Sequence, residues 1–181
     1  MDVNLVHQVD GPTHDDWWCP SSMAGVLNVL DQFYKNGSSA SPVLQGATKH
    51  WDEVLMSRYY NWKPGTMKAG YTQGSSFKLK ADASDDAIDT MAKNAFVPLM
   101  EKMLANGTII EYEIDTEAIH AQAPGSFYLF YLCPNADGID KVNAALRETL
   151  KANPMVAPAF DSVVDFSAHR DYLDRTNAIY K

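Results

Sequence analysis

The sequence predicts an α+β protein, in which an antiparallel sheet packs against helices, and two observations support this prediction. From residue 75 onward, segments of alternating apolar residues are interspersed with segments whose apolar residues recur every three or four positions. Their order is strand, helix, strand, strand, helix, strand. Residues 126–133 form the third of these strands and are apolar on both faces, which is typical of a central strand covered on both sides.

The N-terminal third of the chain is less regular. Residues 3–9 alternate and predict a short strand, whereas residues 21–34 carry an apolar stripe at helical spacing. Asn36-Gly37 predicts the end of this helix, and the small residues of 38–46 predict a loop. Residues 54–62 are rich in aromatic and β-branched side chains, which favour a strand.

Turn-forming residues at 63–65 and 70–74 divide the chain. We therefore expect residues 1–70 to form an N-terminal arm or half-module and residues 75–181 to form the main α+β domain.

The first half of the main domain has clear signals for each element. Residues 76–81 alternate and predict a strand, and Ser84 is a suitable N-cap for the helix that follows. Asn106-Gly107 ends this helix, and Pro98 is expected to kink or split it, because proline lacks a backbone donor. Residues 108–114 predict the next strand.

The second half continues the pattern after the central strand. A helix opened by Asp137-Gly138 is expected to end before Asn153-Pro154. A helical turn around residues 159–164 and a last strand within 170–180 complete the domain. The apolar spacing of residues 163–169 fits a helix and a strand equally well.

This order of elements predicts a ferredoxin-like βαββαβ fold, because right-handed crossovers place both helices on one face of the sheet. The apolar strand at 126–133 would then expose a hydrophobic surface on the other face. Two structures could cover this face of the sheet: the same face of a second subunit, or a matching half built by residues 1–70.

Residues 75–181 resemble the dimeric α+β barrel superfamily, in which two ferredoxin-like sheets pack face to face around a cavity. The resemblance is carried by Phe77-Lys78-Leu79, Phe96-Val97-Pro98-Leu99 and residues 127–132. Three further stretches are similar to an uncharacterised bacterial family with that fold: residues 58–62, 112–115 and 164–170. The resemblance implies a homodimer. The superfamily includes cofactor-independent monooxygenases, isomerases, haem-handling proteins and proteins of no known activity.

The sheet face turned away from the helices is the candidate ligand site. If alternate residues point to the helices, then charged side chains point the other way, beside aromatic ones. The alternative is an ordinary polar face, whose charges reach water and pair across strands. The residues assigned to ligand binding are Lys78, Lys80, Glu111, Tyr128 and Tyr131.

Two histidines are candidates for catalysis. His120 lies in the hairpin before the central strand, where an imidazole could act as a base, and His169 follows Asp165 by four positions. Glu113 is the carboxylate expected to work with them. A structural role for each histidine is the alternative.

No cofactor or metal is expected. His14, Asp15, Asp16 and Cys19 are ligand types, but their spacing does not suit a closed metal site. Nucleotide-binding, zinc-protease, serine-hydrolase and calcium-loop motifs are absent from the sequence.

Charge and hydropathy limit the partners. The chain has 15 Lys and Arg against 23 Asp and Glu, a net charge of −8, so nucleic acid is not expected as a partner. No apolar stretch is long enough to cross a bilayer. Two cysteines and the lack of a signal peptide favour the cytoplasm, with export as the alternative if a signal has been removed.

These observations predict a protein that binds a small apolar or aromatic molecule between sheets. One alternative is a cofactor-independent monooxygenase or isomerase that uses the same face. The other is a structural oligomeric module with a filled interior.

Overall fold

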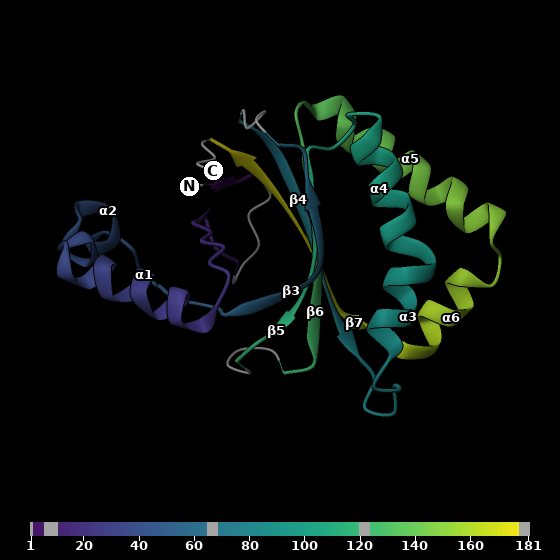
Figure 1. The fold of residues 1–181 in the computed structure, drawn as a ribbon, viewed down its shortest axis with the longest axis horizontal. Coiled ribbons are helices and arrows are strands. Elements are labelled where there is room, and N and C mark those ends of the chain that lie inside the picture. Colours follow the sequence, from purple (N-terminus) through teal and green to yellow (C-terminus); the bar gives the residue numbers. More distant parts are fainter. Residues whose placement is uncertain (1, 6–10, 65–68, 120–123, 178–181) are drawn as a thin grey trace. The chain divides into compact units, whose positions relative to one another are not determined.

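The computed structural model describes residues 2–5, 11–64, 69–119 and 124–177 (Figure 1). The chain forms two compact units. The larger comprises Met1–Asp15 and Val54–Lys181, and the smaller is Asp16–Glu53. The larger unit combines an antiparallel sheet with helices, which confirms the predicted α+β class.

All neighbouring strands of the sheet are antiparallel, and their order is β2-β1-β7-β4-β6-β5-β3. The strands are β1 (Asp2–Asn4), β2 (His14–Asp15), β3 (Leu55–Trp62), β4 (Gly70–Leu79), β5 (Glu111–Glu117), β6 (Ser126–Cys133) and β7 (Val164–Thr176). The segment expected as an N-terminal half thus contributes strands to both edges of one sheet. β6 is central and buried on both faces, as its sequence predicts.

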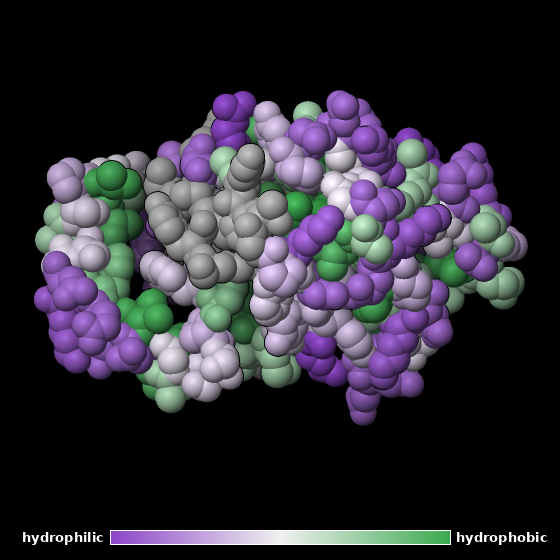
Figure 2. Space-filling model, turned by 45° about the horizontal axis from the view of Figure 1, so that its top comes forward, coloured by the Kyte–Doolittle hydropathy of each residue, from purple (hydrophilic) through white to green (hydrophobic). Residues whose placement is uncertain are grey.

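The helices of the larger unit pack on one face of the sheet (Figure 1). They are α3 (Ala87–Met91), a π-helical turn (Ala92–Phe96), α4 (Val97–Ala105), α5 (Ala136–Ala152) and α6 (Val156–Val163). Between helices and sheet lies the main core, which includes Phe77, Met100, Ile114, Phe127 and Val142. Hydrophilic side chains cover much of the outer surface of these helices (Figure 2).

Pro98 does not split the predicted helix. Residues 87–105 are helical throughout, as α3, the π-helical turn and α4, and the junction residues Met91, Phe96 and Val97 have right-handed helical backbone angles. The irregularity lies directly before Pro98, where the N–H of Val97 donates to the Ala92 carbonyl five residues earlier.

Other element boundaries differ from the expectation. β4 begins at Gly70, within the segment expected as a turn. The reason is close packing, since a Cβ at Gly70 would meet the carbonyl oxygen of Cys133 on β6. β5 begins at Glu111 rather than 108, and β7 begins at Val164, so the ambiguous segment 163–169 is almost entirely strand.

The smaller unit is built around α1 (Met23–Lys35), whose N-cap Ser22 accepts a hydrogen bond from the backbone N–H of Gly25 at 3.1 Å. The aromatic ring of Trp18 lies 6.1 Å from that of Phe33. The loop expected over 38–46 instead contains a 3₁₀ turn (Ser38–Ala40) and α2 (Pro42–Gln45). Ser41 caps α2 and proline occupies its first turn, two signals for a helix start that the small-residue composition obscures.

Candidate functional site

The face of the sheet turned away from α3–α6, here the distal face, carries a row of carboxylates. Side chains alternate along β5, and Tyr112 and Ile114 belong to the core beneath the helices. The residues between them therefore point to the distal face. They form the acidic row: Glu111, Glu113, Asp115 and Glu117.

Aromatic side chains flank the acidic row on both neighbouring strands. Glu113 pairs with Tyr60 of β3 and with Phe130 of β6. The rings of Tyr60 and Trp62 are nearly parallel, with centroids 5.5 Å apart, and those of Tyr128 and Phe130 are 5.9 Å apart and also parallel. The strand that carries the carboxylates thus lies between two strands that each carry a stacked aromatic pair.

A glycine on β4 leaves room for one of these rings. A Cβ at Gly74 would lie 2.6 Å from Cε1 of Phe130 and 3.6 Å from Cδ2 of Tyr172. The Phe130 ring therefore lies over Gly74 of β4, on the side of β6 away from the acidic row. Only glycine permits this approach without a shift of the ring.

Asp115 is the buried member of the acidic row. Asp115 pairs in register with Ser57 of β3 and Tyr128 of β6, and the residue is only 1% exposed. Burial raises its carboxyl pKa to about 6, against smaller opposing effects of hydrogen bonds with Ser57 and Glu113. Its Oδ1 atom has no hydrogen-bond partner within the described parts of the chain.

Ser57 and Glu113 complete this polar group. The hydroxyl of Ser57 lies 3.5 Å from Oε2 of Glu113, at the outer limit for a hydrogen bond. Ser57 is exposed and Glu113 half-buried, so the group reaches the surface on the β3 side of Asp115.

The structure divides the residues assigned to ligand binding. Glu111, Glu113 and Tyr128 share the distal face. Tyr131 instead lies in the core beneath the helices, where its hydroxyl donates to Oε1 of Gln73 at 2.9 Å, and burial raises its pKa.

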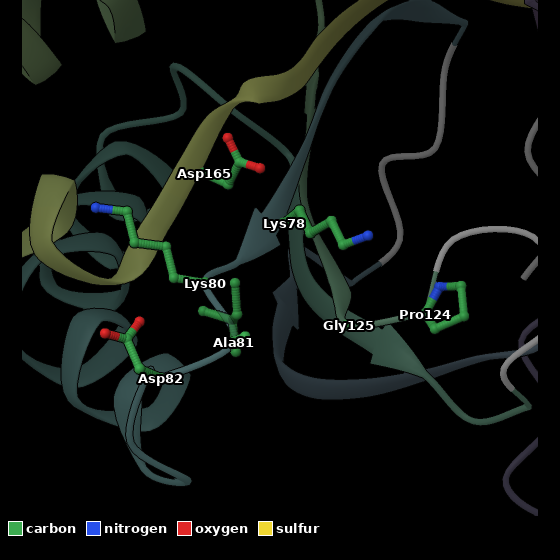
Figure 3. A pocket seen from close by; sticks show the side chains of 8 residues that line it. Lys78, Lys80, Ala81, Asp82, Pro124, Gly125 and Asp165 are labelled. Atoms are coloured by element: carbon green, nitrogen blue, oxygen red, sulfur yellow. The ribbon is translucent and has the colours of Figure 1, made fainter.

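Lys78 and Lys80 line a separate hollow at the end of β4. This hollow has a volume of about 640 Å³ and also contacts Asp82, Pro124 and Asp165 (Figure 3). The two ammonium groups point in opposite directions, and that of Lys80 donates to the Asp161 carbonyl at 2.5 Å. Hydrogen bonds from Ser167, together with the two lysines, lower the pKa of Asp165.

His169 lies at the helix-covered side of the sheet. Its ring stacks on Phe77 with centroids 4.6 Å apart, Nδ1 lies 2.9 Å from the Ser76 carbonyl oxygen, and Nε2 lies 3.2 Å from Oδ2 of Asp171. Ser75 donates to the other oxygen of Asp171 at 2.6 Å. The carboxylate thus stands between hydroxyl and imidazole, which differs from a catalytic arrangement in which the imidazole contacts the hydroxyl.

The structure does not bring the predicted catalytic residues together. His169 packs against the helix-side core, whereas Glu113 belongs to the distal face. His120 lies outside the described residues.

Sequence reasoning missed Asp115, Tyr60, Trp62 and Phe130 as site residues. The alternation in Tyr112-Glu113-Ile114-Asp115 places Asp115 beside Glu113 and could have found it. The aromatic flank on β3 depends on the pairing of β3 with β5, which joins residues 49 to 62 positions apart.

Among the described residues, no group of three or more His, Cys, Asp or Glu side chains is placed to hold a metal ion. Cys133 is a buried free thiol, and burial raises its pKa to about 12. None of the helices formed by residues 2–5, 11–64, 69–119 and 124–177 has the length and hydrophobicity to span a membrane.

Comparisons with known proteins give no relative from which a role could be transferred. No protein-family model matches the chain, and it matches neither a curated protein nor a solved structure.

Proposed function

We propose that this protein binds a small aromatic molecule on the distal face of its sheet, over β3, β5 and β6. The observation that carries the proposal is the acidic row bordered by two stacked aromatic pairs. Tyr60 and Trp62 remain 54% and 39% exposed, so ring surface is available on this face. Stacking a planar ligand on such rings contributes about 0.5–1.5 kcal/mol per ring pair beyond the burial of apolar area.

We further propose that the main domain is ferredoxin-like and that a second copy closes the distal face, as in a dimeric α+β barrel. Three observations support this. The strands follow the order β7-β4-β6-β5, two of the connections between them contain helices, and those helices share one face. A second sheet over the distal face would bury Tyr60 and Trp62 and enclose the ligand.

We include no catalytic step in this function. The carboxylate and imidazole expected to act together belong to different sides of the sheet, and both nitrogens of His169 already face acceptors. A base must lie within hydrogen-bond reach of the proton that it removes.

The test uses Trp62 as a local probe. Trp17, Trp18 and Trp51 belong to the smaller unit, so replacing these three with Phe leaves Trp62 as the single tryptophan. Titration with the uncharged fluorophore N-phenyl-1-naphthylamine is expected to quench Trp62 by energy transfer and to raise the emission of the probe.

Variants then locate the binding site. Tyr60→Ser and Phe130→Leu are each expected to weaken binding of the probe about tenfold, the equivalent of about 1.4 kcal/mol. The matched control Tyr34→Leu removes an exposed aromatic side chain from α1 and should leave affinity unchanged. Unchanged affinity in the two distal-face variants, with both folded, contradicts the proposal.

A further inference from the structure

We propose that the molecule bound on the distal face is a protonated aromatic amine, whose ammonium group donates to Oδ1 of Asp115 while its ring packs on the flanking aromatic side chains. This inference rests on the proposed function and names the chemical class of its ligand.

The first support is the unsatisfied oxygen of Asp115. Buried carboxylate oxygens normally accept hydrogen bonds, and one without a donor is destabilising. Within the described residues no group donates to Oδ1 of Asp115, although the residue is almost fully buried. A donor supplied by a ligand accounts for an acceptor that the described residues leave unsatisfied.

The second support is the arrangement beside this oxygen. Ser57 pairs in register with Asp115, and its hydroxyl lies 3.5 Å from Oε2 of Glu113, a long contact. An ammonium group has three donors in a compact head. It can therefore replace the weak contact between Ser57 and Glu113 and donate to both carboxylates at once.

The third support is charge complementarity. The faces of aromatic rings attract cations, and Tyr60 borders Glu113 on the β3 side. The acidic row adds negative potential along the same strand, and the chain as a whole carries a charge of −8. An anionic ligand is repelled here, and a neutral one lacks the attraction to the carboxylates.

The experiment compares three probes that share a phenyl ring and a short spacer. These are 2-phenylethylamine, which is cationic at pH 7.5, the neutral 2-phenylethanol and the anionic 3-phenylpropanoate. Isothermal titration calorimetry on the full chain at low salt measures each affinity. Competition with N-phenyl-1-naphthylamine shows whether each probe occupies the same face.

We expect the amine to bind at least about tenfold more tightly than the alcohol and the anion to bind weakest. Asp115→Asn should remove the preference for the amine and leave alcohol binding unchanged, and Glu113→Gln should reduce that preference in part. Glu148→Gln is the matched control, because it removes the same charge from an exposed site on α5. Circular dichroism confirms that each variant is folded.

The outcomes separate the inference from the proposed function. If alcohol and amine bind equally well and both displace the fluorophore, the aromatic face is correct and the amine inference is wrong. If the preference for the amine persists in Asp115→Asn and Glu113→Gln, the ammonium site lies elsewhere and the inference is also wrong. If neither these probes nor the fluorophore binds, the proposed function fails together with the inference.

Discussion

Asp115 occupies a position where a carboxylate is costly. It is buried, one of its oxygens lacks a donor among the described residues, and its pKa rises from 3.8 to about 6. At a pH where the carboxyl group is charged in both the folded and the unfolded state, a pKa shift of this size lowers the free energy of unfolding by about 3 kcal/mol. Such a cost at one residue is typical of binding sites, where stability is lower than the fold would allow.

The stability of the protein should therefore depend on pH through Asp115. Because its pKa is higher in the folded state, the folded state binds more protons between about pH 4 and 6, and the contribution of Asp115 falls as the pH rises through this window. Asp115→Asn should match the parent near pH 4 and be more stable by up to about 3 kcal/mol at pH 8. Urea unfolding at both pH values measures this difference.

Other titratable groups lie around Asp115, so the urea-unfolding experiment includes a control for them. Glu113 and Glu117 lie on its own strand, Tyr60 on β3 and Tyr128 on β6. Glu117→Gln, in the same row, serves as the control for general loss of charge. A difference between Asp115→Asn and the parent that is the same at pH 4 and pH 8 would show that Asp115 does not titrate as described.

At the scale of elements, the sequence predicted features that depend on neighbouring residues better than features that depend on contacts between distant strands. Pro98 marked a local irregularity, because its missing donor acts within one helical turn, but the helix continues through a π-helical turn and is not split. The start of β4 was wrong, because Gly70 and Gly74 resemble turn residues in sequence, whereas in space they admit Cys133 and Phe130 of β6. The distal face was predicted through the alternation of Glu111 and Glu113, but its aromatic flank on β3 required a long-range strand pairing.

The packing of β6 across β4 gives a prediction at this scale. Gly74→Ala places a methyl group 2.6–2.7 Å from two carbons of the Phe130 ring, so the ring must move. We expect a loss of about 1–3 kcal/mol in the free energy of unfolding and weaker binding of the fluorophore. In a Phe130→Leu background, Gly74→Ala should lower the free energy of unfolding by clearly less. An equal loss in both backgrounds would show that the Phe130 ring does not restrict residue 74.

At the scale of the whole molecule, the sheet is covered asymmetrically. The helices α3–α6 pack on one face, and on the other face Tyr60 and Trp62 remain exposed at the β3 edge. Closure by a second copy would bury these rings, but it would also bring two acidic rows toward each other. Apolar burial favours such a dimer, and repulsion between the carboxylates opposes it.

This balance predicts a dimer that responds to salt and to one substitution. Exposed charges are screened beyond about 8 Å at 0.15 M salt, so the dimer fraction should rise between 0.02 and about 0.3 M sodium chloride. Trp62→Glu should yield a monomer, because it adds a charge where an aromatic ring would be buried. Leu150→Glu, at a similarly exposed apolar residue on α5, should leave the dimer intact. Size-exclusion chromatography with light scattering measures both effects. A monomer at every salt concentration, or a dimer broken equally by both substitutions, would mean that the distal face is not closed by a second copy and that the ligand binds to an open sheet.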